Sequence, residues 1–213
     1  MNEHEFASSE YTAGQLNAMV KLLKKQAGGD GPDSFLRGEL SVSKPGQRWH
    51  EHGGIIYLSP VISDGTTGSQ WIERHERKGF RLADYAKRAL HSDDFKPTNG
   101  VITEIAVLKG VLFEDNGRTT KKARALGEAL RFTKPNAEVA CLIRENFSDE
   151  EIKAMGLWWI VVMHEPIISG GGPCLLGPAR DGDGLWLRAY RDYPGRRWDH
   201  VDGFAFAVSQ VSS

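Results

Sequence analysis

The 213-residue sequence lacks several features that mark particular classes of protein. Its two cysteines, Cys141 and Cys174, are too few for a disulfide framework, so we expect both thiols to be free. Its longest apolar run, residues 157–163, is far shorter than the ~20 residues that a membrane-spanning helix needs. The N-terminal stretch MNEHEFASSE has neither the basic start nor the apolar middle of a secretory signal. We therefore expect a cytoplasmic protein without a membrane segment.

An excess of charge of one sign is also missing. The 27 Lys and Arg residues stand against 28 Asp and Glu residues, which gives a formal net charge of -1 and a pI near 6.7. This balance argues against attraction of the whole surface to nucleic acid or anionic membrane. A basic segment is nevertheless present over residues 118–134, where Glu128 is the one acidic residue. Its cations are Arg118, Lys121, Lys122, Arg124, Arg131 and Lys134.

The pattern of apolar residues predicts an α+β protein with a single mixed sheet and several short helices packed on it. We expect this domain to occupy residues 31–213, after an N-terminal flexible segment and helix over residues 1–30. The predicted strands cover residues 36–43, 54–62, 100–113, 157–163, 185–190 and 203–209, the first two forming a hairpin. The predicted helices cover residues 12–26, two segments within 63–90, 118–132, 134–147 and 148–156. Residues 168–184, ISGGGPCLLGPARDGDG, predict a long loop.

The stretch GLWWIVVMHEPIISGGGPCLLG, residues 156–177, contains a candidate nucleophile. Its apolar run predicts a buried central strand, and His164 and Glu165 follow that strand directly. A thiol at Cys174, activated by an imidazole that a carboxylate orients, is the arrangement of a hydrolase or transferase. The alternative is structural, with His164 capping the strand and Cys174 serving as a small apolar loop residue. On the catalytic hypothesis we predict that His164 lines the largest pocket.

Four histidines form a candidate metal site for zinc or iron. His50 and His52 lie two residues apart, so both point to one face if they are on a strand. This His-x-His pair, preceded by PGQRW, resembles the metal-binding pair of cupins, although GGIIY stands where a cupin glutamate is expected. His164 and His200, the latter within DHVD, complete the predicted ligand set. Solvated loop histidines are the alternative.

Two further segments contain candidate ligand-binding residues. SDGTTGSQW lies between a predicted strand and helix, where free N–H groups near Asp64, Thr66 and Thr67 could hold a phosphate or carboxylate. A helix cap made by the same residues is the structural alternative. In the aromatic C-terminal segment, Trp186 and Trp198 are candidates for a ligand-binding surface, and core packing is the alternative.

Several blocks of the sequence resemble known proteins. SDGTTG, NAEVACLIRE, MGLWWIVVMHEPI and GFAFAVSQ are similar to blocks of an uncharacterised family of hypothetical bacterial proteins, a resemblance that implies no mechanism. The C-terminal pattern of a tryptophan, a polar gap and GFAFAVS is similar to the last strands of C-type-lectin-like and formylglycine-enzyme-like domains.

No complete catalytic motif is present, so the sequence favours a non-catalytic protein that binds a small anionic ligand or a protein partner. A hydrolase or transferase that uses His164 with Cys174, or a metal held by histidines, is the first alternative. A nucleic-acid-associated protein that uses the basic helices is the second. Whether the protein is an enzyme stays open at this point.

Overall fold

The computed structural model describes residues 17, 20, 21, 24, 29, 31–37, 48–182 and 184–209. The chain separates into two units, residues 1–47 and residues 48–213. In the first unit, helix α2 spans Gly31–Leu36, and the isolated described residues Asn17, Val20, Lys21 and Lys24 are helical. Most of the helix predicted over residues 12–26 lies outside the described residues. Of the strand predicted over residues 36–43, Leu36 ends α2 and Arg37 lies in a turn, and the remainder lies outside the described residues.

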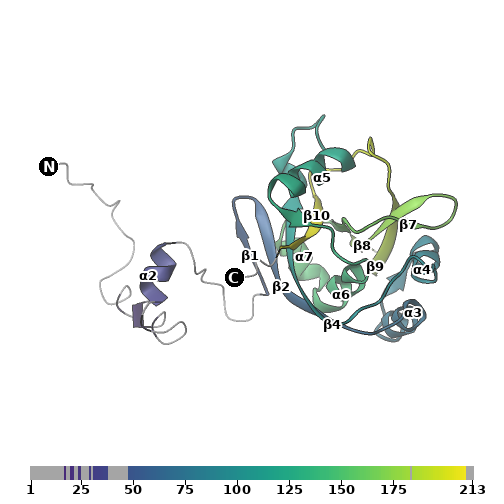
Figure 1. The fold of residues 1–213 in the computed structure, drawn as a ribbon, viewed down its shortest axis with the longest axis horizontal. Helices are drawn as coiled ribbons and strands as arrows, with labels where there is room; N and C mark the ends of the chain where they lie inside the picture. Colours follow the sequence, from purple (N-terminus) through teal and green to yellow (C-terminus); the bar gives the residue numbers. More distant parts are fainter. Residues whose placement is uncertain are drawn as a thin grey trace. The chain divides into compact units, whose positions relative to one another are not determined.

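The second unit is built on one mixed sheet of ten strands, which confirms the predicted α+β class (Figure 1). The strand order is β1-β2-β4-β10-β6-β8-β9-β3, while β5 pairs with β10 and β7 pairs with β8. The strands are β1 Trp49–His52, β2 Ile55–Asp64, β3 Arg81–Leu82, β4 Asn99–Lys109, β5 Phe132–Thr133, β6 Trp159–Val162, β7 Ile167–Ile168, β8 Pro173–Asp181, β9 Gly184–Arg191 and β10 Asp202–Val208.

At the centre of the sheet, β6 and β5 pair with successive parts of β10. β10 pairs antiparallel with β4 on one side and parallel with β6 on the other. The pairing with β6 ends opposite Ala205, and β5 pairs with Ala207 and Val208 instead. The residues that follow β6, beginning with Met163 and His164, therefore leave the sheet beside β5.

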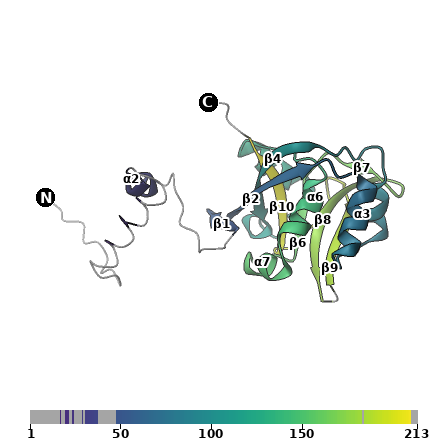
Figure 2. The ribbon, with the colours of Figure 1, turned by 90° about the horizontal axis from the view of Figure 1, so that it is seen from below.

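Helices pack on both faces of the sheet. They are α3 Gly68–Arg77, α4 Asp84–Leu90, α5 Thr120–Ala129, α6 Val139–Asn146 and α7 Asp149–Ala154, with a 3-10 turn at Gly110–Leu112. The main core contains Trp71 of α3, Ile143 of α6 and Ala205 of β10, and Figure 2 shows α6 across β6 and β8. Phe204 and Phe206 alternate with Ala205, so they enter a second core that contains Ala123 of α5. No helix among the described residues has the length and apolar character needed to cross a bilayer.

The prediction of a long loop over residues 168–184 is wrong. β7 and β8 occupy most of this segment, and every residue from Cys174 to Ala179 is buried. Gly177 is required by close packing of strands, because a Cβ there would lie 2.2 Å from the carbonyl oxygen of Ile160 on β6. Gly177 and Pro178 therefore belong to a buried strand, although such residues usually indicate loops.

The predicted hairpin also has a different first strand. β2 pairs with β1, and the two strands are joined by Gly53 and Gly54, both with positive φ, as in a two-residue hairpin turn. The helices predicted within residues 63–90, 118–132, 134–147 and 148–156 are confirmed as α3 to α7. The buried strand predicted over residues 157–163 is confirmed as β6, after Gly156 with φ 77°.

Candidate functional site

His164 is buried just beyond β6, and backbone groups occupy both of its ring nitrogens. Nδ1 lies 2.6 Å from the carbonyl oxygen of Glu165, and Nε2 lies 2.8 Å from the amide nitrogen of Leu176 on β8. Because a carbonyl accepts and an amide N–H donates, the ring is neutral and carries its proton on Nδ1. Burial lowers the pKa of His164 to about 4. Neither nitrogen is therefore available to take a proton from a thiol.

Cys174 and Glu165 have other partners than those of the predicted catalytic triad. Cys174 lies on β8 opposite Arg191 of β9, and burial raises the pKa of its thiol to about 11. The Glu165 carboxylate is exposed and accepts a hydrogen bond of 2.6 Å from Lys134. In the part of the chain that the structure describes, no hydrogen bond joins His164 to the Cys174 thiol or to the Glu165 carboxylate.

The predicted metal ligands lie on three different segments. His50 is on β1, where its ring stacks on that of Tyr57 with 5.2 Å between the centroids. His52 is an exposed residue at the end of β1, and His200 lies in the turn before β10. Among the described residues, no group of three or more His, Cys, Asp or Glu side chains is placed to hold a metal ion.

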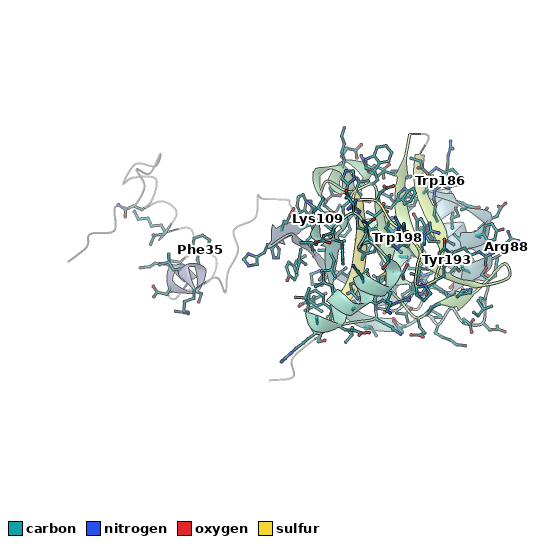
Figure 3. All side chains as sticks on the ribbon, turned by 90° about the horizontal axis from the view of Figure 1, so that it is seen from above. Phe35, Arg88, Lys109, Trp186, Tyr193 and Trp198 are labelled. Atoms are coloured by element: carbon teal, nitrogen blue, oxygen red, sulfur yellow. The ribbon has the colours of Figure 1, made fainter. Side chains whose placement is uncertain are left out.

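The two candidate tryptophans, both labelled in Figure 3, have different surroundings. Trp198 is buried in the second core, and its indole N–H donates to the Thr120 hydroxyl at 3.0 Å. Trp186 lies on β9, with the guanidinium carbon of Arg188 4.5 Å from its ring centroid. They therefore do not form one ligand-binding surface, and Trp198 follows the core-packing alternative.

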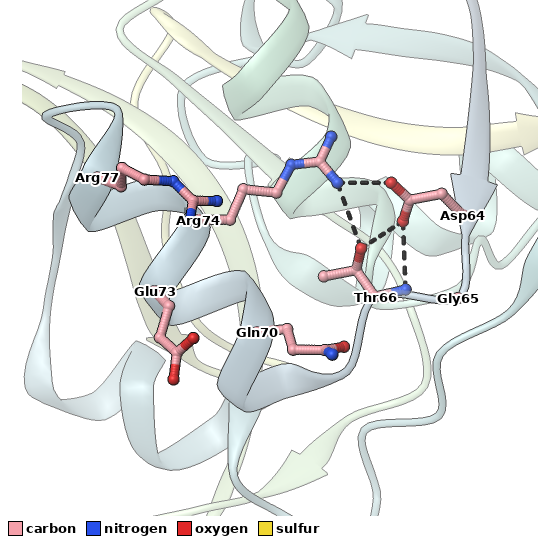
Figure 4. Close-up of a pocket in the computed structure, with 7 residues that line it drawn as sticks. All are labelled: Asp64, Gly65, Thr66, Gln70, Glu73, Arg74 and Arg77. Atoms are coloured by element: carbon pink, nitrogen blue, oxygen red, sulfur yellow. Dashed lines mark hydrogen bonds and ion pairs between the residues drawn. The ribbon is translucent and has the colours of Figure 1, made fainter.

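Two of the predicted ligand residues, Asp64 and Thr66, line an open cavity at the start of α3, which we call the α3 cavity (Figure 4). Its volume is about 480 Å³. The described residues that line it are Asp64, Gly65, Thr66, Gln70, Glu73, Arg74 and Arg77. This lining contains two guanidinium groups and two carboxylates, so the charges of the cavity balance.

The polar groups of the α3 cavity bond mainly to one another. Asp64 accepts hydrogen bonds from Thr66 and from Arg74, and these bonds lower the pKa of Asp64. Arg74 also donates through two nitrogens to Glu145 of α6, which fixes α3 against α6. Thr67 and Gln70 form a capping box that satisfies the first turn of α3. The capping box agrees with the helix-cap alternative. The two arginines of the cavity are balanced by its two carboxylates.

A smaller cavity lies beside the C-terminal end of β9, and we call it the β9 cavity. Its volume is about 270 Å³. The described residues that line it are Tyr85, Ser169, Cys174, Ala189, Tyr190, Arg191 and Arg196. This lining contains two guanidinium groups and no carboxylate. Unlike the α3 cavity, it therefore has a net positive charge.

A glycine-rich turn forms one wall of the β9 cavity. Arg191 donates from Nη2 to the carbonyl oxygen of Gly170 at 2.6 Å, and its guanidinium carbon lies 5.6 Å from the ring centroid of Tyr85. A Cβ at Gly170 would lie 2.6 Å from the Tyr85 ring, and one at Gly172 would lie 2.6 Å from Arg191. Glycine at these positions therefore allows the turn to lie against both side chains.

Three of the residues that line the β9 cavity have buried polar atoms without a hydrogen-bond partner among the described residues. The hydroxyl groups of Ser169 and Tyr190 are buried and have no hydrogen-bond partner among the described residues, and the same is true of Nε of Arg196. Burial raises the pKa of Tyr190, so its hydroxyl keeps its proton. The guanidinium of Arg196 is held over the Trp198 ring, 4.3 Å from the centroid. Unpaired buried polar groups are uncommon in folded proteins and call for an explanation.

Compared with protein-family models, curated proteins and solved structures, the chain matches none of them. Of the residues that line the β9 cavity, sequence reasoning identified Cys174 alone. The arginines could have been found from the segment YRDYPGRRW, where cations and aromatic residues alternate.

Proposed function

We propose that the protein is a non-catalytic binding protein for a small organic anion, which it holds in the β9 cavity. One observation carries the proposal: Arg191 and Arg196 line the same cavity, and no carboxylate among the described lining residues offsets their charge. Guanidinium groups form strong charge-assisted hydrogen bonds to carboxylates and phosphates. A carboxylate would offset one of the two positive charges, and a phosphate monoester would offset both.

The remaining lining residues support an anion with an apolar part. Tyr85, Tyr190 and Ala189 add aromatic and apolar groups to the lining, and Ser169 is a further lining residue. A volume of about 270 Å³ is near the lower limit for small-molecule sites, which suits a compact ligand such as an aromatic carboxylate or phosphate ester.

The chemistry of Cys174 favours binding over catalysis. Its pKa of about 11 leaves almost no thiolate at neutral pH, and the thiolate is the nucleophilic form. The predicted base, His164, has both ring nitrogens hydrogen-bonded to the backbone. A covalent mechanism would therefore require a rearrangement of β8.

The proposal is tested by calorimetric titration with phenyl phosphate, benzoate and benzyl alcohol, a neutral compound of similar size. We expect both anions to bind and benzyl alcohol not to bind. Arg191→Gln should weaken anion binding about tenfold or more, since hydrogen bonds to charged groups contribute roughly 1.5–3 kcal/mol. Arg196→Gln should act in the same direction.

Arg77→Gln is the matched control, because Arg77 lines the charge-balanced α3 cavity and its loss changes the net charge equally. Melting temperatures of all variants show whether the fold is retained. Equal binding of benzyl alcohol and benzoate, or an equal loss of affinity in Arg77→Gln, would contradict the proposal.

A further inference from the structure

The loop between β9 and β10 borders two cavities. Arg196 lines the β9 cavity, and Pro194 lines another cavity of about 480 Å³, which we call the α5 cavity. The other described residues that line the α5 cavity are Lys121, Arg124, Ala125 and Glu128, all on α5. The two cavities are thus connected along the chain by the short segment 194–196.

Backbone hydrogen bonds fix this loop on the start of α5. The amide of Lys121 donates to the carbonyl oxygen of Pro194 at 3.1 Å, and the amide of Thr120 donates to that of Arg196 at 3.2 Å. Thr119 and Arg197 form an isolated β-bridge next to these bonds. The loop and the first turn of α5 therefore lie side by side.

This region carries cations that the described protein does not neutralise. Lys121, Lys122 and Arg197 are exposed, and none of them forms an ion pair with another described residue. Lysines in the first turn of a helix are unfavourable, because the helix dipole places positive charge there. Arg124, further along α5, does form an ion pair, with Asp192 at 2.8 Å.

An aromatic side chain lies within the same loop. The side chain of Tyr193, labelled in Figure 3, is 52% exposed, whereas the nearby Trp198 is buried. The carbonyl oxygen of Tyr193 accepts the amide of Arg196, which fixes the tyrosine backbone beside the arginines. We define the loop surface as Lys121, Lys122, Tyr193, Arg196 and Arg197.

We propose that the loop surface binds single-stranded nucleic acid, with one phosphate in the β9 cavity and the following phosphates on Arg197, Lys121 and Lys122. The inference rests on the proposed anion site and names its ligand as a nucleotide chain. A row of cations beside an exposed aromatic ring is the combination that single strands require, because phosphates need charge and unpaired bases need a stacking surface. An acidic peptide would use the charges but would leave Tyr193 without a role.

The test is fluorescence anisotropy with a 3′-labelled oligothymidine and the full chain. We expect affinity to fall as salt rises, with a log–log slope of about -0.7 for each phosphate contacted. The triple variant Lys121→Gln, Lys122→Gln, Arg197→Gln should bind at least about tenfold more weakly, with a slope roughly 2 units smaller. Tyr193→Ala should weaken binding by roughly tenfold with an unchanged salt slope.

The matched control is the triple variant Arg77→Gln, Lys96→Gln, Lys153→Gln, which removes three exposed cations from other elements and changes the net charge equally. It should bind the oligonucleotide like the wild type. An equal loss in this control, or equal competition by polyglutamate of the same length, would overturn the inference.

Titration with phenyl phosphate separates this inference from the proposed function. Binding of phenyl phosphate without binding of the oligonucleotide would overturn the nucleic-acid inference and leave the anion site in place. Absence of both would overturn both. Retention of phenyl phosphate binding in the loop-surface triple variant, together with loss of the oligonucleotide, is the expected result.

Discussion

The Nε2 atom of His164 accepts a hydrogen bond from the Leu176 amide at 2.8 Å, across the gap that opens where β6 ends. In the described β6–β8 ladder, Trp159 opposite Ala179 is the one registered pair. The imidazole therefore accepts a backbone hydrogen bond of β8 that a neighbouring strand would otherwise accept. His164 therefore has a structural role in this contact, and substitution of His164 should change the stability of the fold.

We expect His164→Leu to lower the free energy of unfolding by about 3 kcal/mol, because two buried backbone groups lose their partner. His164→Gln retains a donor and an acceptor and should lose less. Urea denaturation measures both changes. The affinity for phenyl phosphate should be unaffected, since His164 does not line the β9 cavity. A stable Leu variant that no longer binds the anion would instead indicate a functional histidine.

Stability should fall as the protein is acidified below neutral pH. Burial lowers the pKa of His75 and of His164 from 6.5 to about 4, so between these values the unfolded state binds more protons than the folded state. The free energy of unfolding then rises with pH over this window, by roughly 3 kcal/mol for each histidine at most. Asp202 opposes this effect, because burial raises its pKa from 3.8 to about 6. Between these values the folded state binds more protons than the unfolded state, so the stability that Asp202 contributes is lost as the pH rises.

The variant His75→Phe isolates one of these histidines. His75 is fully buried, and its ring packs against those of Trp71 and Phe80. Phenylalanine keeps the aromatic packing and removes the titrating group. The slope of unfolding free energy against pH should therefore decrease by up to one proton between pH 6.5 and 4. An unchanged slope would show that His75 does not titrate on unfolding.

Thr67 is predicted to act as a helix cap. Thr67→Ala should cost about 1 kcal/mol of unfolding free energy, because it removes the acceptor for the Gln70 amide. Thr67→Ser preserves the hydroxyl and should be nearly neutral. Thermal or urea unfolding measures both effects. A phosphate affinity that disappears in Thr67→Ala at unchanged stability would favour a ligand site at α3.

Gly68 should tolerate no side chain. A Cβ at this position would lie 1.7 Å from the carbonyl oxygen of Leu90 in α4, so Gly68→Ala must force α3 and α4 apart. We expect a loss of about 3 kcal/mol, at the upper end of overpacking effects. Gly182→Ala is the control, because no non-adjacent described residue has an atom within 4 Å of its Cβ position. Similar unfolding curves for the two variants would contradict the α3–α4 contact.

The Cys174 thiol should react slowly with alkylating agents. A pKa raised from 9.0 to about 11 reduces its thiolate fraction about 100-fold at neutral pH. Iodoacetamide should therefore alkylate the native protein far more slowly than the urea-unfolded protein. Mass spectrometry of the modified peptide measures the rate, with the fully buried Cys141 as internal reference. Rapid native alkylation of Cys174 would revive the nucleophile hypothesis.

Local patterns in the sequence predicted the elements that depend on local interactions. Ser148 and Glu151 have capping-box spacing, and both capping hydrogen bonds form at the start of α7. The apolar run before His164 predicted β6. The same reasoning failed at β8, because Gly177 is required by a contact with β6 and not by a turn.

The candidate site depends on contacts between distant residues, which explains why it was missed. Arg191 meets Gly170 and Tyr85 because β8 pairs with β9 and α4 lies beside them. Arg196 enters the same lining from the next loop. A single sequence gives the residue types of such a site but not the pairing that brings them together.

The position of β10 has a consequence for biosynthesis. Strands β1, β2 and β4 form one half of the sheet and β6, β8, β9 and β3 the other, and β10 joins them although it is the last described strand to be synthesised. Until Asp202–Val208 has left the ribosome, the apolar edges of β4 and β6 have no partner. The nascent chain therefore exposes two unpaired strand edges at once, and unpaired edges of this kind are sites at which aggregation begins.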